Sequence, residues 1–181
     1  MSVPGYPTPG YPSTSPPAYA TPAAPPSRPG VLTAAFFAGV ASALFTLIGA
    51  VLLIVSAQDL AQETADKELA EVGLDSSAGG AIVQQAIDDA ATTLSIRGYS
   101  GVFSAVLTLA FVLAARNGAL WARIVATLFL VGSWCANGLV MFDVAPTATI
   151  ALDGLAIVLS LVAVVLFFLP AVNRYAAARR R

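Results

Sequence analysis

Residues 31–57 read VLTAAFFAGVASALFTLIGAVLLIVSA and contain no ionisable side chain. An apolar run of about 20 residues is long enough to cross the hydrocarbon core of a bilayer as an α-helix. This run is longer, so the helix can also tilt or reach into the headgroup region. The stretch therefore predicts a transmembrane helix, and with it a membrane protein.

The composition of the chain supports the same class. Hydrophobic residues make up 57% of the 181 residues and charged residues only 10%, whereas soluble domains carry about 25% charged residues. The chain has no histidine, one cysteine (Cys135) and one lysine (Lys67). These counts exclude a histidine-ligated metal site, a Ser-His-Asp or Cys-His active site, an intrachain disulfide and a Walker-type phosphate loop. We therefore expect no enzyme, with no catalytic, cofactor-binding or metal-binding residues, and the net charge of −1 gives no basic field for nucleic acid.

Three further windows lack charge and are bounded by ionisable residues: 98–115, 124–142 and 154–173. The first of these is the shortest, but Arg97 and Arg116 at its ends can extend their charged heads to the interfaces. The sequence predicts an all-α membrane protein, a four-transmembrane-helix bundle. We expect the membrane domain to cover 30–175, with spans at about 31–57, 98–115, 121–142 and 148–170.

The charges sort to opposite sides of these four spans. The side with both termini and the 116–123 loop holds no acid and seven arginines, namely Arg28, Arg116, Arg123, Arg174, Arg179, Arg180 and Arg181. The other side holds all ten acids, with Lys67 and Arg97 as its bases. Basic residues in short loops stay in the cytoplasm. We therefore expect a multi-pass protein of the plasma membrane with both termini cytoplasmic, ending in the basic segment 176–181.

A cleaved signal peptide is the alternative for the first helix. Val55-Ser56-Ala57 resembles a small-residue cleavage site. The apolar run before it is much longer than the roughly 7–15 residues of a signal-peptide core, and a proline-rich tail precedes it. We expect the helix to be retained; cleavage after Ala57 would leave three spans.

Two segments lie outside the predicted spans. Residues 1–29 hold ten of the twelve prolines and no Ile, Leu or Phe, which predicts a disordered tail with polyproline II character. Pro16-Pro17-Ala18-Tyr19 matches the pattern that WW domains bind, although such a tail produces this match by chance. The tail can still dock a cytoplasmic partner.

Residues 58–97 form an extracytoplasmic segment that the pattern predicts to be helical. One face carries Ala61, Ala65, Leu69 and Val72; after breakers at Gly73 and 75–80, a second carries Val83, Ile87, Ala90 or Ala91, and Leu94. Helices this short are not stable alone, so their apolar faces must lie on each other, on the outer end of the bundle or on a partner. A cap over the protein's own helices is the simpler expectation.

Polar residues inside the spans are the candidate functional residues. An ionised Asp at mid-membrane costs roughly 2.5–3.5 kcal/mol and tends to be functional. Asp153 lies about 10 Å inside the fourth helix if that helix starts at Pro146, and at the interface if the span is 154–173. Ser133 and Asn137 share one face of the third helix. They favour interhelical hydrogen bonds over the lining of a solute path.

Two features concern the helix ends and the packing of the helices. Trp121, Arg123, Arg116 and Arg174 are the expected anchors at the membrane interface. The small-residue stripes are expected contact faces, because lipid-embedded helices associate through close packing. They comprise Ala35, Gly39, Ala43 and Ala50 on the first helix, and Gly132, Ala136 and Gly138 on the third.

Three stretches together carry a resemblance: the tail at 1–29, NGALWARI at 117–124 and LPAVNRY at 169–175. With these, the chain resembles the small four-span membrane proteins with Pro/Gly/Tyr-rich N-terminal tails of high-GC Gram-positive bacteria. Those proteins are mostly uncharacterised, so the resemblance implies architecture and a membrane location but no activity. The chain departs from claudins and tetraspanins, whose extracellular loops carry paired cysteines.

These observations predict a non-enzymatic interaction or structural component of the cell envelope. Its expected partners are the lipid bilayer and other membrane or envelope proteins, which would bind through 58–97 or the 1–29 tail. A homo-oligomer is possible. The alternative is a small transporter or channel component with a polar path near Asp153, Ser133 and Asn137.

Overall fold

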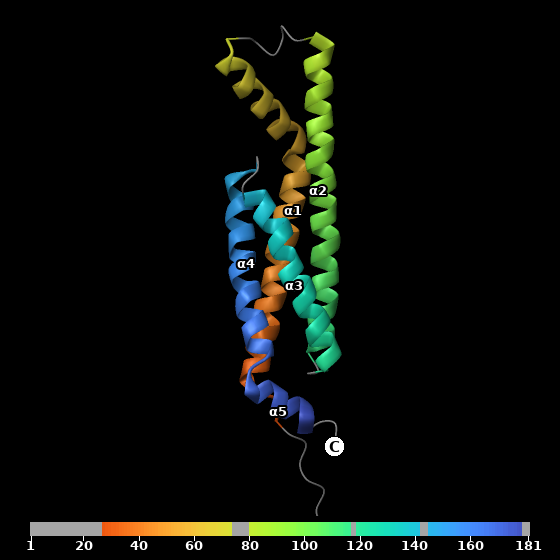
Figure 1. The fold of residues 1–181 in the computed structure, drawn as a ribbon, viewed down its shortest axis with the longest axis vertical. Coiled ribbons are helices and arrows are strands. Elements are labelled where there is room, and N and C mark those ends of the chain that lie inside the picture. Colours follow the sequence, from red (N-terminus) through yellow and green to blue (C-terminus); the bar gives the residue numbers. More distant parts are fainter. Residues whose placement is uncertain (1–26, 74–79, 117–118, 142–144, 179–181) are drawn as a thin grey trace, which may run out of the picture.

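The computed structural model describes residues 27–73, 80–116, 119–141 and 145–178, apart from the side chains of 136, 137 and 139–141. Within these ranges the chain forms helices and no strand (Figure 1). The helices are α1 (Gly30–Glu71), α2 (Gly80–Ala115), α3 (Leu120–Met141), α4 (Thr147–Phe167) and α5 (Pro170–Ala178). The predictions for residues 1–26, including the WW-type motif, and for 179–181 lie outside the described residues.

Three of the helices, α1, α2 and α4, are long and apolar enough to cross a membrane. The chain is therefore built as a membrane-embedded helical protein. The described apolar part of α3, Leu120–Cys135, is shorter than a span. Four spans consequently remain a prediction from the sequence.

The first four helices form a closed ring of neighbours. α1 packs against α2 and α4, and α3 packs against the same two helices (Figure 1). The largest apolar cluster lies where the helices meet and joins side chains from all five. Its buried members are Leu32, Ala35, Val112, Ala115, Ala122, Ala126, Leu130, Ala163, Phe167 and Val172.

Small residues let α1 and α2 approach closely. Ala35, Gly39, Ala43 and Ala50 are all buried, as the stripe on the first predicted span indicates. A Cβ on Gly39 would lie 3.1 Å from the methyl groups of Val112, and one on Gly101 would lie 2.9 Å from the Cβ of Ala50.

The stripe expected on the third helix behaves differently. Gly132 is exposed, and a Cβ there would meet no described atom within 4 Å. The prediction of a packed contact at Gly132 is therefore wrong within the described part of the chain. Spacing identifies a face of the helix but not the neighbour that covers it.

Both α1 and α2 continue far beyond the length that a bilayer requires. α1 has 42 residues and α2 has 36, which corresponds to about 63 and 54 Å against a hydrocarbon core of about 30 Å. The helical segment expected at 58–97 is present, but each half continues a long helix instead of forming a separate short one. No Gly or Pro interrupts either half, and the left-handed Gly73 (φ 73°) follows the end of α1.

We call residues 58–73 and 80–97 the hairpin arm. Its two helices contact each other through Ala61, Ile87 and Ala91. Gln58 Nε2 also donates a hydrogen bond to Asp88 Oδ1 (3.2 Å). Figure 1 shows that the arm rises past the outer ends of α3 and α4 and that its helices diverge toward the tip. The arm therefore projects outward, in contrast to the expected cap.

The divergence follows a change in the direction of α1. Ser56 Oγ donates a hydrogen bond to the Leu52 carbonyl, and Thr64 Oγ1 donates one to the Leu60 carbonyl, both at 2.7 Å. Hydroxyl groups that bond back to the preceding turn bend helices. Both bonds lie in the half of α1 that leads into the arm.

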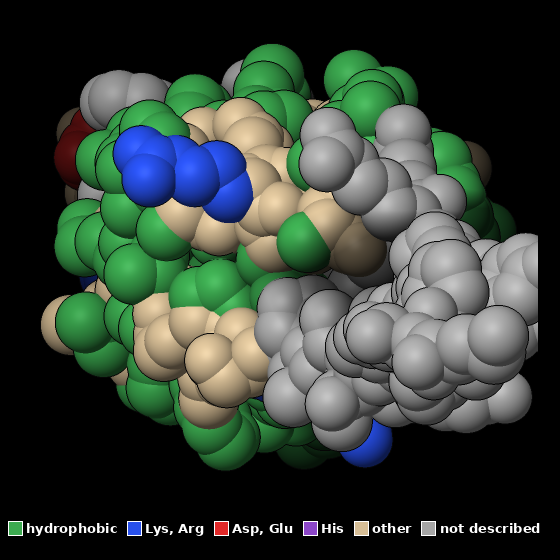
Figure 2. Space-filling view, turned by 90° about the horizontal axis from the view of Figure 1, so that it is seen from below, with side chains coloured by type: hydrophobic (Ala, Val, Ile, Leu, Met, Phe, Trp, Pro, Cys, Tyr) green, Lys and Arg blue, Asp and Glu red, His purple; other side chains and the backbone are tan. Residues whose placement is uncertain are grey.

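Three of the described arginines lie at the opposite end of the bundle. Arg28 precedes α1, Arg116 follows α2, and Arg174 lies on α5. Pro170 begins α5, as its fixed φ favours at a first helical position. Figure 2 looks onto this end, where blue side chains stand among hydrophobic ones.

Replacing Gly98 with Ala tests the close approach of α1 and α2. A Cβ at Gly98 would meet the Ile54 side chain and would lie 3.0 Å from the Ala50 carbonyl oxygen. Overpacking of this kind costs about 1–3 kcal/mol. We expect that loss in the free energy of unfolding, measured by SDS titration in mixed micelles with tryptophan fluorescence.

Gly132→Ala is the matched control, because its Cβ enters open space. It should be neutral, or stabilising by up to about 1 kcal/mol, since Ala favours a helix. Equal stability of the two variants would contradict the packing described here.

Candidate functional site

Asp153 is a buried acid on α4. Its side chain is 3% exposed, and a Cβ on Gly49 of α1 would lie 3.0 Å from its Oδ1. α4 begins at Thr147, directly after Pro146, so Asp153 lies inside the helix, about 9 Å from its start. No described residue forms a hydrogen bond or an ion pair with this carboxyl group.

Asp153 shares one face of α4 with two buried hydroxyl residues, Thr149 and Ser160. Thr149, one turn earlier, is buried, and its Oγ1 has no hydrogen-bond partner among the described residues. Ser42 Oγ of α1 donates to the Ala156 carbonyl of α4 (2.8 Å). Trp134 Nε1 of α3 donates to Ser160 Oγ, which in turn donates to the Ile157 carbonyl (2.7 Å). Polar contacts thus join α4 to α1 and α3.

Ser133 and Asn137 are the other two candidates for a polar path, and neither is shown to contact Asp153. Ser133 is buried, and its Oγ donates to the Leu130 carbonyl of its own helix (2.7 Å). The Asn137 side chain lies outside the described residues. Within the described part of the chain, no hydrogen bond connects Ser133 to Asp153. The geometry favours structural hydrogen bonds over a continuous polar lining.

The sequence analysis did not single out Ser42, Ser160 or Trp134. Ser160 lies seven residues after Asp153 and therefore shares its helix face, which is a usable signal. Ser42 stands beside Ala43 in the small-residue stripe. No comparable signal marks Trp134, because the pairing of α3 with α4 has to be known first.

Arg123 is buried among the helices. The sequence had predicted it to be an exposed anchor at the membrane surface. Its side chain is 1% exposed. Its Nη1 donates hydrogen bonds to the Phe167 carbonyl (2.9 Å) and to Asn173 Oδ1 (3.0 Å). The last carbonyls of a helix lack intrahelical partners and carry partial negative charge. The guanidinium therefore satisfies the end of α4 and fixes the junction with α5.

The remaining expected anchors lie on the surface. Trp121 in the first turn of α3 is 61% exposed. Arg116 and Arg174 are exposed as well. They lie near helix ends, and their role as membrane-interface anchors stays a prediction.

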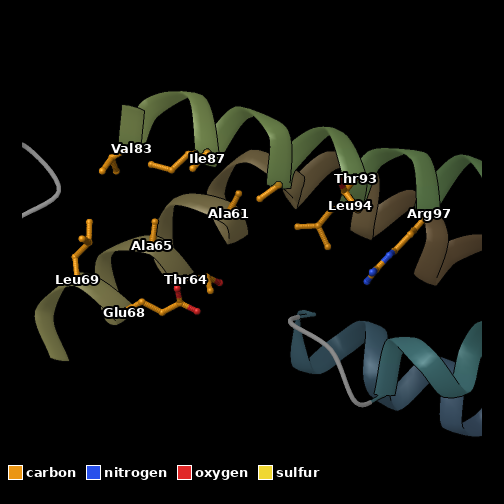
Figure 3. Close-up of a pocket in the computed structure, with 12 residues that line it drawn as sticks. Ala61, Thr64, Ala65, Glu68, Leu69, Val83, Ile87, Thr93, Leu94 and Arg97 are labelled. Atoms are coloured by element: carbon orange, nitrogen blue, oxygen red, sulfur yellow. The ribbon is translucent and has the colours of Figure 1, made fainter. Parts of the chain in front are cut away.

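The hairpin arm contains a groove with a volume of about 610 Å³. Figure 3 shows its side chains pointing from both helices of the arm into one space. α1 contributes Ala61, Thr64, Ala65, Glu68 and Leu69, and α2 contributes Val83, Ala86, Ile87, Ala90, Thr93, Leu94 and Arg97. Both sets recur every three or four residues, so each is one face of a helix. They are largely the apolar faces that the sequence predicted.

The arm as a whole is acidic. The described residues of the arm include only Lys67 and Arg97 as bases, and Lys67 forms an exposed ion pair with Glu63 (2.6 Å). The acids of this part are Asp59, Glu63, Asp66, Glu68, Glu71, Asp88 and Asp89. Glu68 is the acid that lines the groove itself. Figure 3 shows Glu68 on the diverging part of α1 and Arg97 at the end nearer α3 and α4.

Replacing Arg123 with Met tests the junction between α4 and α5. The variant leaves the Phe167 carbonyl and Asn173 without their donor, and hydrogen bonds to a charged group contribute about 1.5–3 kcal/mol. We expect a loss of that size in SDS unfolding. Arg116→Met removes the same charge from the same loop and should change stability by less than about 0.5 kcal/mol. Equal losses of stability in the two variants would attribute both effects to membrane insertion and would contradict a stabilising role for the Arg123 hydrogen bonds.

Replacing Asp153 with Asn tests the cost of the buried acid. The variant keeps the shape of the side chain and removes its charge, so we expect the free energy of unfolding to rise by up to about 3 kcal/mol. Asp59→Asn, in the exposed arm, should leave it unchanged. A loss of stability in Asp153→Asn would show that the carboxylate has a favourable partner.

No protein-family model, no curated protein and no solved structure matches this chain. Within the described ranges, no three Cys, Asp or Glu residues come together in a way that could hold a metal ion. The function therefore has to be argued from the groove and from the buried polar residues.

Proposed function

We propose that the protein is a non-enzymatic membrane protein that binds another polypeptide through the groove of its hairpin arm. The observation that carries this proposal is the groove, about 610 Å³ in volume and lined mainly by apolar side chains. It lies on an arm that projects beyond the ends of the neighbouring helices, and no described residue covers it. Uncovered apolar surface of this kind marks interaction sites.

The proposed topology has four spans, with α3 as the third. α3 has 22 residues, which corresponds to about 33 Å, enough for a hydrocarbon core of about 30 Å. Its place in the ring between α2 and α4 supports this assignment.

The orientation follows from the two ends of the molecule. Arg28, Arg116 and Arg174 lie at the end with α5, whereas seven acids lie on the arm. Under the positive-inside rule, this sorting supports cytoplasmic termini in a plasma membrane and an arm on the outer side. The same layout supports a relationship to the small four-span proteins of high-GC Gram-positive bacteria.

A transporter or channel component is the second candidate. The burial of Asp153 beside Thr149, neither with a hydrogen-bond partner among the described residues, is the observation that favours it. The hydroxyls of Ser42 and Ser160 donate instead to helix carbonyls, which supports a packing role. Loss of solute flux in proteoliposomes on Asp153→Asn, with Asp59→Asn unaffected, would favour this candidate.

Photo-crosslinking from the arm tests the docking function. In a Cys135→Ser background, a benzophenone maleimide is attached to a cysteine at Val83, which lines the groove, or at Gln85, which is exposed outside it. We expect polypeptide adducts from Val83→Cys in native membranes, and about fivefold fewer from Gln85→Cys, because a docked chain excludes water from the groove face only. Adducts with lipid alone, or equal yields from both positions, would contradict the proposal.

A membrane-impermeant maleimide applied to intact cells controls for topology. It should label the cysteine at Gln85 and spare one placed at Arg174. The reverse result would invert the proposed orientation.

A further inference from the structure

We infer that the occupant of the groove is a positively charged amphipathic α-helix of another polypeptide. This inference rests on the proposed docking function and names the class of partner. Three observations carry it: the length of the groove, the small residues in its lining, and the negative charge of the arm.

The groove is long enough to hold a short α-helix. On α2 its lining runs from Val83 to Arg97, and on α1 from Ala61 to Leu69, distances of about 21 and 12 Å along the helix axes. A short helix lies in such a groove with apolar side chains at i, i+3, i+4 and i+7 directed into it. The diverging helices of the arm leave room for it as the third member of a small bundle.

Part of the groove lining favours close helix packing. Four of its residues, Ala61, Ala65, Ala86 and Ala90, carry only a methyl group. Small side chains allow a helix backbone to approach, whereas the larger Leu69 and Val83 stand near the open end (Figure 3). The apolar face of an incoming helix thereby gains contact on two sides.

The net negative charge of the arm favours a basic partner. The described arm carries seven acids against Lys67 and Arg97, and Lys67 is paired with Glu63. A field of one sign attracts partners of the opposite sign and repels those of the same sign. A basic polar face on the incoming helix complements the net negative charge of the arm; Glu68 is the acid that lines the groove, and Arg97 lines it at the end nearer α3 and α4.

The same charge argues against other occupants. A second copy of the arm brings the same seven acids, and anionic lipid headgroups bring further negative charge. The described basic residues Arg28 and Arg174 lie at the opposite end of the bundle from the groove.

Binding of designed peptides to the full-length protein in zwitterionic nanodiscs tests the inference. The probe is a labelled helical peptide of Leu and Lys, about 14 residues long, with Leu at i, i+3, i+4 and i+7. A Leu/Glu peptide of the same pattern and a Leu/Lys peptide of scrambled order are its controls. Empty nanodiscs give the background for adsorption to lipid.

Matched variants locate the binding. Val83→Ser, on the groove, should weaken binding of the Leu/Lys peptide about tenfold through lost apolar contact, whereas Ile82→Ser, 81% exposed and outside the lining, should change it less than about twofold. Glu68→Gln should weaken binding about threefold and reduce its dependence on salt, and Glu63→Gln should do neither. Circular dichroism of each variant checks that its helices are retained.

Other outcomes overturn the inference. Equal binding of the Leu/Glu or scrambled peptide, or no effect of Val83→Ser, would remove the basic helix as occupant. Dimerisation of the protein that Val83→Ser abolishes would assign the groove to a second copy. If the groove crosslinks to a polypeptide in membranes but the Leu/Lys peptide does not bind, the docking function stands and the inference fails; without polypeptide crosslinks, the docking function itself fails.

Discussion

The close approach of α1 to its neighbours is the constraint on which the rest of the structure depends. Lipid tails are as apolar as leucine, so burial of apolar surface does not drive helices together inside a bilayer. Contact instead requires small residues, and α1 presents them on both sides. Gly39 and Ala50 meet Val112 and Gly101 of α2, while Gly49 meets Asp153 of α4. α3 then completes the ring through α2 and α4.

Polar groups inside the bundle also hold the helices together. Ser42 reaches a carbonyl of α4, and Trp134 reaches the hydroxyl of Ser160, so hydrogen bonds connect helices at places where small residues allow contact. Arg123 does the same for a helix end, because it donates to the carbonyl of Phe167. Asp153 and Thr149 are exceptions, with no such partner among the described residues.

Much of the fold could be predicted from local pattern, and the remainder depends on tertiary contacts. The charge-free run at 31–57 identified the central helix, and Gly73 was correctly placed as a breaker. The continuity of α1 through Ala57 was missed, since a change in hydropathy marks the membrane surface and not the end of a helix. The topology rule counts Arg123 as a surface charge and carries no information about its contacts. The apolar faces of the groove were visible in the spacing, but the divergence of the two helices was not.

The uninterrupted backbone of α1 from Gly30 to Glu71 has a mechanical consequence. A rod about 63 Å long that is gripped along its lower half behaves as a lever. With no flexible joint at the bilayer surface, a sideways load on its free end becomes a torque on the gripped half. That torque falls on the packed half of the helix, whose contacts include Gly49 against Asp153.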